Sequence, residues 1–168
     1  MSSTPGFMAT SPSQSVPLEE RLSYRCSLIS TRITRFITPM LESRYGLTVI
    51  TWRVMAVIGR YAPLSAKEVA QHTSTDAFFV SRAVEQLVNL EFVARSVDAR
   101  DRRRSCLELT PAGRTVHRKV EGVINRLEAS LITELDAAQR EALHTALAYL
   151  DAQTQRLQDG EQSWQDFA

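Results

Sequence analysis

The feature that most constrains the fold is a pair of short helical segments in the middle of the chain, separated by a few polar residues. Ser65 and Glu68 have the spacing of a capping box, in which a hydroxyl and a carboxylate satisfy the backbone donors at a helix start. This helix is expected to break at the polar cluster 72–75, which can also cap a second helix near residues 76–89. The inward residues of the second helix are Val80, Val84 and Leu87. The pattern predicts a helix-turn-helix.

A hairpin with a charged tip is predicted directly after this pair. Residues 92–97 and 105–109 have the composition and alternation of short strands. Thr110 and Pro111 then supply a cap and a first-turn proline for another helix. This order of elements suits DNA, because the second helix fits the major groove and an extended tip can reach the minor groove.

Further helices with apolar stripes flank this central region. The first, over residues 18–45, has inward residues at spacings of four and three, and Pro39 inside it predicts a kink or a short break. Gly46 is expected to end it and Thr48 to cap a second helix. The inward residues of that second helix are Trp52, Met55 and Ile58.

Two more striped helices follow the hairpin, one from Pro111 and one starting near Asp136. Stripes at both ends of the chain cannot bury themselves alone, so they indicate a second subunit. The predicted class is mostly α (α+β), a winged helix-turn-helix with a two-stranded wing and terminal helices for dimerisation. Its expected parts are a disordered arm (1–16), dimerisation helices (17–46 and 111–157), a DNA-binding lobe (47–110) and a polar tail (158–168).

Charge and cysteine usage bear on the partner and the compartment. The net charge is only +1, but residues 95–119 hold eight Lys or Arg against three acids, which concentrates positive charge where a polyanion could bind. No apolar run could cross a membrane and the N-terminus does not resemble a signal peptide, so a cytoplasmic protein is expected. With only Cys26 and Cys106, a disulfide framework is improbable.

Candidate DNA contacts lie on the second helix of the pair and on the hairpin. Arg can pair bidentately with guanine and Gln with adenine. The four arginines within five residues at the hairpin tip repel one another unless phosphates or counter-charges lie close. The expected DNA-binding residues are Ser65, Thr75, Phe78, Phe79, Ser81, Arg82, Gln86, Arg95, Asp98, Arg100, Asp101, Arg102, Arg103 and Arg104.

The hairpin and its exit resemble those of the MarR family of bacterial regulators. Residues 98–103 and 109–113 fit the pattern D-x-R-D-x-R…L-T-x-x-G, and the resemblance extends over roughly residues 18–157. Further matches are Leu47, Thr48 and Trp52 in the second helix, and Val80, Ser81, Arg82, Val84 and Leu87 in the recognition helix. The resemblance implies a triangular homodimer joined by the first, fifth and sixth helices, and repression relieved by a small ligand.

By the same resemblance, Arg100 is expected to enter the minor groove at the wing tip, with Asp98 and Asp101 restraining the wing. A narrow minor groove attracts a guanidinium independently of family. Two recognition helices in successive major grooves imply a pseudo-palindromic operator with half-sites about 10 bp apart.

Two positions depart from the family pattern. The glycine usual after the recognition helix is absent, so Asn89 or Glu91 must build that turn in a less favoured conformation. Phe78 and Phe79 stand where polar residues are usual. Their rings could contact thymine methyl groups, pack under the wing or alter specificity.

The effector and a redox alternative concern the first two helices. The family's ligand pocket would be lined here by Tyr24, Arg25, Leu28, Arg32, Trp52 and Met55, a set that suits an aromatic carboxylate. The same arginines could instead simply face solvent. One branch of the family senses hydroperoxides through a cysteine in the first helix. Cys26 lies near that position but on the apolar face, where a buried, inert thiol is usual.

Other functional classes are disfavoured. His72, His117 and His144 lack metal-site spacings, and no nucleophile-elbow, phosphate-loop or paired-cysteine motif is present. No enzyme, metal or cofactor is therefore expected. The remaining alternative is a winged-helix module that binds protein and leaves DNA alone, which the near-neutral total charge would permit.

Overall fold

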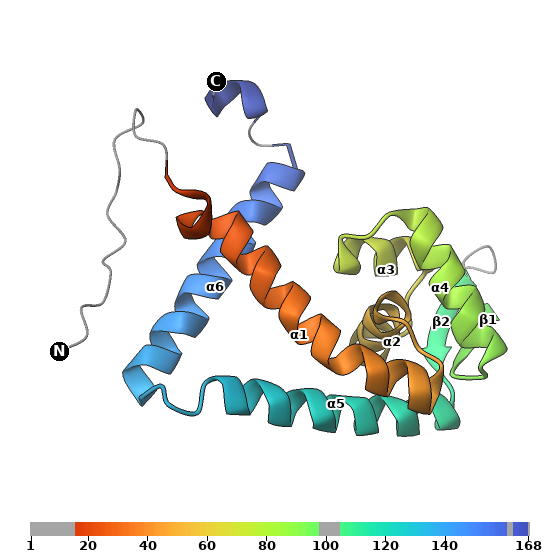
Figure 1. The fold of residues 1–168 in the computed structure, drawn as a ribbon. Coiled ribbons are helices and arrows are strands. Elements are labelled where there is room, and N and C mark those ends of the chain that lie inside the picture. The colour runs from red at the N-terminus through yellow and green to blue at the C-terminus, as the bar shows by residue number, and fades with distance from the viewer. Residues whose placement is uncertain (1–15, 98–104, 161–162, 168) are drawn as a thin grey trace. The chain divides into compact units, whose positions relative to one another are not determined.

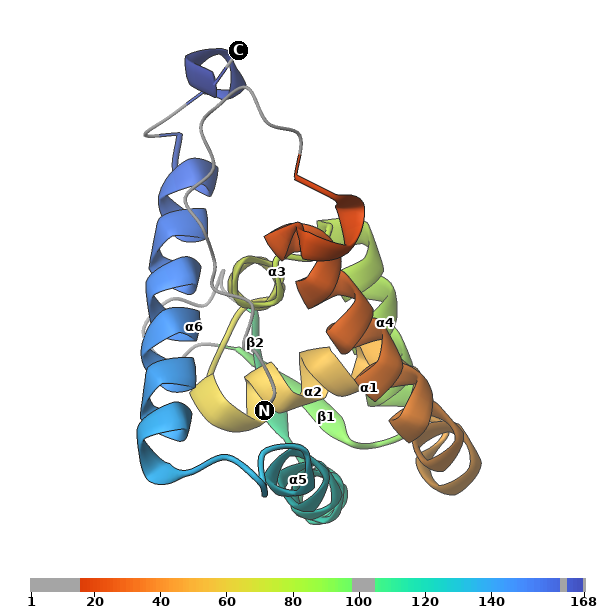
Figure 2. The same ribbon diagram turned by 60° about the vertical axis from the view of Figure 1, so that its left-hand side comes forward.

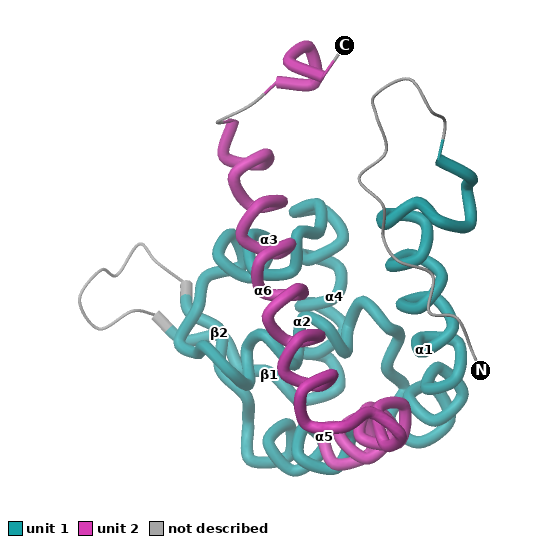
Figure 3. Tube along the Cα trace, turned by 90° about the vertical axis from the view of Figure 1, so that its left-hand side faces the viewer, with its two compact units in different colours: residues 1–120 teal, residues 121–168 magenta. Residues whose placement is uncertain are grey.

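The structure, a computed structural model, describes residues 16–97, 105–160 and 163–167 (Figure 1). In chain order its elements are η1 (Leu18–Glu20), α1 (Leu22–Tyr45), α2 (Val49–Tyr61), α3 (Ala66–Thr73), α4 (Ala77–Asn89), β1 (Val93–Val97), β2 (Ser105–Leu109), α5 (Pro111–Leu131), α6 (Ala137–Gln158) and η2 (Trp164–Phe167). This mostly helical fold with a two-stranded antiparallel sheet confirms the predicted class. The chain forms two compact units, residues 1–120 and 121–168 (Figure 3).

The first helix ends at Tyr45 as the sequence predicts, but it begins at Leu22 and not at residue 18, because the short turn η1 and the extended Arg21 precede it. α1 runs unbroken through Pro39, so the short break considered there is absent. Gly46 ends α1 in the left-handed conformation, with φ of 65°. Thr48 caps α2: its hydroxyl accepts from the Thr51 backbone N–H, and the Thr51 hydroxyl accepts from the Thr48 N–H.

The helix-turn-helix consists of α3 and α4. Ser65 and Glu68 form the expected capping box at the start of α3. The cap of α4 differs from the prediction, because Asp76 and not the 72–75 cluster supplies it. The Asp76 carboxylate accepts a hydrogen bond from the Phe78 backbone N–H at 2.8 Å. An ionised cap at this end is also favoured by the helix dipole.

β1 and β2 pair in an antiparallel hairpin in which Val93 lies opposite Leu109 and Arg95 opposite Leu107. Leu64 bridges Leu107 with two backbone hydrogen bonds, which attaches the hairpin to the loop before α3. The hairpin is therefore fixed to the helix-turn-helix at its base.

The core of the first unit lies where α2, α3 and α4 pack against one another and α2 contacts β2 (Figure 2). Its fully buried side chains are Leu41, Leu47, Thr51, Val54, Met55, Ile58, Val69, Val80, Val84, Leu87 and Val120. Val80, Val84 and Leu87 are the residues predicted to hold α4 inward, so this prediction is confirmed.

The terminal stripes are much less covered. Cys26, Ile29 and Phe36 of α1 are exposed in the single chain, and α6 has no buried residue. The burial expected for Cys26 is therefore wrong for one chain alone, since periodicity identifies an apolar face and not whether something covers it.

The turn between α4 and β1 is made by Glu91, whose φ is 57°. Because the usual glycine is missing, either Asn89 or Glu91 was expected to adopt a less favoured conformation, and Glu91 does so. The left-handed region costs a residue with a side chain about 1–2 kcal/mol relative to glycine. The Thr110 hydroxyl donates to the Glu91 carbonyl at 2.6 Å and helps to hold the turn.

Replacing Glu91 with glycine is expected to stabilise the protein. The strain that glycine relieves should exceed the cost of the extra entropy that glycine gives the unfolded chain. The free energy of unfolding should therefore rise by about 0.5–1 kcal/mol. Chemical denaturation would measure the change. Glu91→Ala is the matched control, because it removes the same carboxylate and keeps the strain. A gain for alanine equal to that for glycine would assign the effect to the carboxylate.

Candidate nucleic-acid interface

Helix α4 presents one face to the core and the opposite face to solvent. Successive helical residues are rotated by about 100°. Phe78 and Arg82 therefore project on the side opposite Val80, Val84 and Leu87, and both are exposed. Ser81 and Asn89 are exposed as well. The outward face carries the residues that would meet base edges if α4 entered a major groove.

Aromatic rings and a cation meet on this face. The rings of Phe78 and Phe79 are 60% and 53% exposed and contact each other edge to face, with centroids 5.6 Å apart. The Arg82 guanidinium carbon lies 5.5 Å from the centre of the Phe78 ring. Of the explanations open for these rings, burial under the wing is not supported, because both remain largely exposed.

Arg82 also lies near an acid on its own helix. Its Nη1 is 4.0 Å from Glu85 Oε2, and both side chains are mostly exposed. An exposed pair of this kind contributes little to stability. The guanidinium therefore remains available to an external acceptor.

Gln86, one of the predicted DNA-binding residues, makes a long-range hydrogen bond within the chain. Its Nε2 donates a hydrogen bond to the Gly46 carbonyl at 2.8 Å, across 40 residues of sequence. The bond ties α4 to the C-terminal cap of α1. The bond uses one of the two amide N–H donors and leaves the Gln86 Oε1 acceptor, so the predicted contact of Gln86 with adenine stays a prediction.

Two other candidates, Ser65 and Thr75, are also engaged locally. The Ser65 hydroxyl interacts with Glu68 in the capping box, and the Thr75 hydroxyl donates to the Thr73 carbonyl at 3.0 Å. Both residues are half-buried. The Ser65 hydroxyl caps the start of α3, and the Thr75 hydroxyl lies in the turn between α3 and α4. Any contact with a phosphate would be additional to these roles.

The hairpin is buried in part and exposed in part. Cys106, Leu107 and Leu109 of β2 are buried, while Arg95 of β1 is exposed. The predicted tip residues Asp98, Arg100, Asp101, Arg102, Arg103 and Arg104 lie outside the described residues. The described part of the wing therefore presents Arg95 beside the base of that segment.

The expected ligand residues separate into two sets. Tyr24 and Leu28 are half-buried on α1, and Arg25 and Arg32 beside them are exposed. Trp52 and Met55 belong to the core instead: Met55 is fully buried, and the Trp52 ring lies 5.6 Å from that of His117. Core packing explains Met55 without any ligand, and the exposed arginines agree with the solvent-facing alternative.

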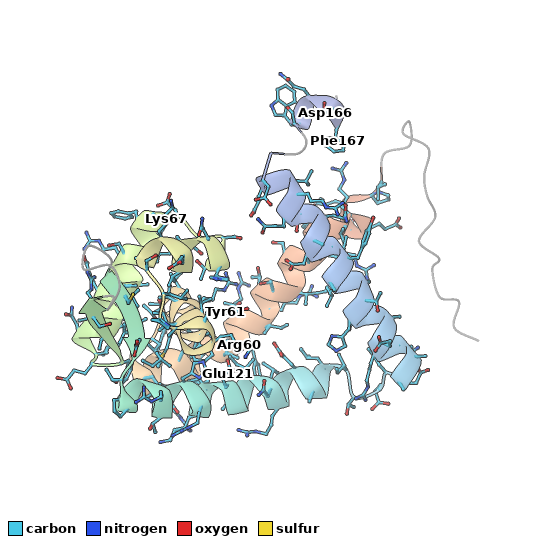
Figure 4. All side chains as sticks on the ribbon, turned by 180° about the vertical axis from the view of Figure 1, so that it is seen from behind. Arg60, Tyr61, Lys67, Glu121, Asp166 and Phe167 are labelled. Carbon is cyan, nitrogen blue, oxygen red and sulfur yellow. The ribbon has the colours of Figure 1, made fainter. Side chains whose placement is uncertain are left out.

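Two ring contacts near the interface were not predicted. The rings of Tyr61 and His72 stack with centroids 4.4 Å apart, joining the end of α2 to the end of α3. Arg60 lies 5.9 Å from the Tyr61 ring, and Figure 4 shows Arg60 and Tyr61 at the end of α2 and Lys67 on α3. Tyr61 and His72 lie on different helices, so no local pattern signals their stacking, whereas Arg60 and Tyr61 are neighbours in the sequence.

Gly113 lies where a side chain would not fit, because an added Cβ would meet the Phe92 carbonyl oxygen. This glycine is the last residue of the L-T-x-x-G pattern, so its signal was present in the sequence. Its physical reason, a close approach of the backbone at the start of α5, is visible only in the structure.

Metal binding and membrane insertion find no support in the described residues. Among them, no three His, Cys, Asp or Glu side chains cluster in a way that could hold a metal ion. Nor does any described helix have the length and apolar character to cross a membrane.

The helix-turn-helix, its outward aromatic and cationic face and the antiparallel hairpin define a winged helix-turn-helix protein. The sequence model of the MarR family matches residues 45–104, which contain α2, α3, α4 and β1. Over these residues the chain is similar to the MarR family. The curated relatives that the chain resembles are named as transcriptional regulators.

Individual relatives and solved structures are similar to this chain. The chain is 23% identical over 133 residues to the HTH-type transcriptional regulator BilQ of Clostridium symbiosum, covering 79% of this chain and 92% of that protein. The crystal structure of MarR superposes with a TM-score of 0.74 at 23% identity, over 89% of this chain and all of that one. Streptococcus pneumoniae FabT in complex with DNA gives a TM-score of 0.71 at 18% identity, over 82% and 98% of the two chains.

Proposed function

We propose that this chain is a homodimeric, sequence-specific DNA-binding repressor whose grip on its operator is released by a small ligand. The observation that carries the DNA-binding part is the outward face of α4. There Phe78, Ser81 and Arg82 are exposed on a helix that Val80 and Leu87 hold against the core. A helix fixed in this way can present a constant set of side chains to a major groove.

Two further observations support DNA as the partner. Arg95 is exposed on β1, and residues 95–119 carry a strong excess of positive charge although the whole chain has a net charge of only +1. The similarly folded FabT was crystallised with DNA. We expect each wing to add phosphate and minor-groove contacts through Arg100, Arg102, Arg103 and Arg104.

The apolar stripes support a homodimer. Leu22, Ile29 and Phe36 of α1 are exposed, as are Leu143 and Leu147 of α6. Side chains of this size lose about 1.5–3 kcal/mol of hydrophobic stabilisation each if they remain in water. We therefore propose that residues 17–46 and 111–157 form the subunit interface and that residues 47–110 form the DNA-binding lobe.

For the effector we retain an aromatic carboxylate as the proposal, with a narrower site. Tyr24 and Leu28 offer partly buried apolar surface on α1, and the exposed Arg25 and Arg32 could pair with a carboxylate. A panel of aromatic acids tested by thermal shift, and then for loss of DNA binding, would examine this proposal. If an acid stabilises an Arg25→Ala/Arg32→Ala variant as much as it stabilises the wild-type chain, these two arginines do not bind its carboxylate.

DNA binding itself is tested by a mobility-shift titration on the DNA flanking the gene at two salt concentrations. If two protomers together neutralise about six phosphates, raising salt from about 50 to 200 mM should weaken binding by about a thousandfold. Arg100→Ala should weaken binding and reduce the salt dependence. No salt-sensitive shift at any site would favour the protein-binding module instead.

A thiol-based sensor remains a second candidate because Cys26 is exposed in the single chain. If Cys26 senses peroxide, mild peroxide should oxidise it and release DNA, and a Cys26→Ser variant should bind DNA and resist release. Mass spectrometry of the treated protein reports the modification directly. An unmodified thiol with undiminished DNA binding would remove this candidate. Cys106, which is buried, serves as the internal reference.

A further inference from the structure

The first turn of α4 carries an aromatic pair that the fold does not use. Phe78 and Phe79 are among the more exposed large apolar side chains of the described residues, at 60% and 53%. Single exposed apolar residues are common on protein surfaces, but here two rings are adjacent and in edge-to-face contact. The N-terminal residues of a recognition helix are those that contact base edges. The pair therefore lies where a base-reading surface is expected.

Arg82 extends this surface by one helical turn. It follows Phe78 by four residues, so the two side chains share a line along the outward face of α4. The guanidinium carbon lies 5.5 Å from the Phe78 ring centre, within the range of a cation–π contact. This contact restrains a long side chain and leaves the donors of its planar fork free. An apolar ring and an oriented cationic fork are thus held next to each other.

The base edges of the major groove offer one partner for each group. Only thymine presents a methyl group there, and guanine presents two acceptors that match the arginine fork. Neighbouring bases are stacked about 3.4 Å apart, so groups separated by 5.5 Å can reach bases one or two steps apart.

We propose that α4 reads a thymine close to a guanine in each half-site. The Phe78 ring, with Phe79 beside it, contacts the thymine methyl group, and Arg82 pairs with the guanine one or two steps away. This inference rests on the proposed DNA-binding function and names the bases that the function requires. An apolar protein partner fits this surface less well, because the rings adjoin the exposed Arg82 and Ser81 on a helix-turn-helix.

The test removes single methyl groups from the operator. After an operator has been selected from random DNA with the wild-type chain, each thymine is replaced in turn by deoxyuridine, which lacks only the methyl group. At the contacted thymine the affinity should fall about fourfold per half-site, or about fifteenfold when both half-sites are changed. Replacing a nearby guanine with 7-deazaguanine, which lacks the N7 acceptor, should reduce affinity by about fivefold or more.

Variants connect these losses to particular side chains. Phe78→Ala should bind the thymine and uracil operators equally, and Arg82→Ala should lose its sensitivity to 7-deazaguanine. Asn89→Ala, an exposed change at the far end of the same helix, should retain both sensitivities. Because Phe78 is exposed, its variant should fold normally, which thermal unfolding would check.

The possible results test the assignment of bases separately from the proposed DNA binding. If the wild-type chain binds a selected operator but shows no methyl sensitivity at any thymine, the base assignment is overturned and DNA binding stands. Unchanged methyl sensitivity in both Phe78→Ala and Phe79→Ala would also overturn it. If no DNA is bound in a salt-sensitive manner, both the inference and the proposed function fail.

Discussion

Replacing Gly113 with alanine is expected to destabilise the protein by about 3 kcal/mol or more. The added Cβ would meet the carbonyl oxygen of Phe92, and this oxygen is held in place because it accepts a hydrogen bond from the Thr110 N–H at 3.0 Å. The Gly113 N–H in turn donates to the Thr110 hydroxyl at 2.9 Å. A backbone atom cannot move aside as a flexible side chain can. The start of α5 or the turn before β1 must therefore shift.

The measurement is thermal or chemical unfolding. For a chain of 168 residues, a loss of this size corresponds to a melting temperature lower by roughly 10 °C. Gly122→Ala is the matched control in the same helix, because the nearest atom to its added Cβ is Arg126 Nη1 at 3.6 Å, an ordinary contact. That control should be neutral or stabilising by about 0.5–1 kcal/mol. Equal stability of the two variants would refute the close-approach explanation.

Reversing the charge at Arg82 is expected to weaken operator binding by about a hundredfold. A bidentate contact to guanine accounts for about 1–3 kcal/mol per half-site, and a dimer makes it twice. A glutamate at this position would also repel the phosphates. The mutated side chain is exposed, so Arg82→Glu should leave the unfolding midpoint almost unchanged. Affinity would be measured by fluorescence anisotropy at fixed salt.

A swap of Arg82 with Glu85 distinguishes position from charge. The variant Arg82→Glu/Glu85→Arg keeps the net charge and an acid–base pair three residues apart, but it removes the cation from its place beside the Phe78 ring. If the oriented guanidinium reads the operator, binding should remain weak in the swapped chain. Recovery of wild-type affinity would mean that α4 contributes positive charge without base reading.

The sequence predicted best those features that depend on neighbouring residues. The capping box at Ser65 depends on side chains three residues apart, so spacing alone reveals it. The missing glycine next to a predicted helix end required Asn89 or Glu91 to take a less favoured conformation, and Glu91 is the one that does. The cap of α4 was misplaced because several adjacent polar residues could each have capped it, and only the backbone path selects Asp76.

Features that depend on distant residues could not be predicted in this way. The bond from Gln86 to Gly46 joins positions 40 residues apart, and nothing in either local sequence indicates the other. Helical periodicity placed Met55 on an apolar face without showing whether that face lines a pocket or fills the core. The exposure of Cys26 has the same origin, because an apolar stripe does not reveal its covering partner.

The Gln86 bond also has a consequence for how the proposed reading helix could be controlled. Helix α4 has 13 residues. It contains both the first turn that would face the bases and the Gln86 amide that bonds to Gly46. If the last turn of α1 moves, either α4 moves with it or the hydrogen bond between Gln86 and Gly46 breaks. The proposed effector residues also lie on α1. Ligand binding there could therefore change the orientation of α4 through the hydrogen bond between Gln86 and the Gly46 carbonyl. Gln86→Leu would uncouple α4 from α1 while leaving the reading face intact.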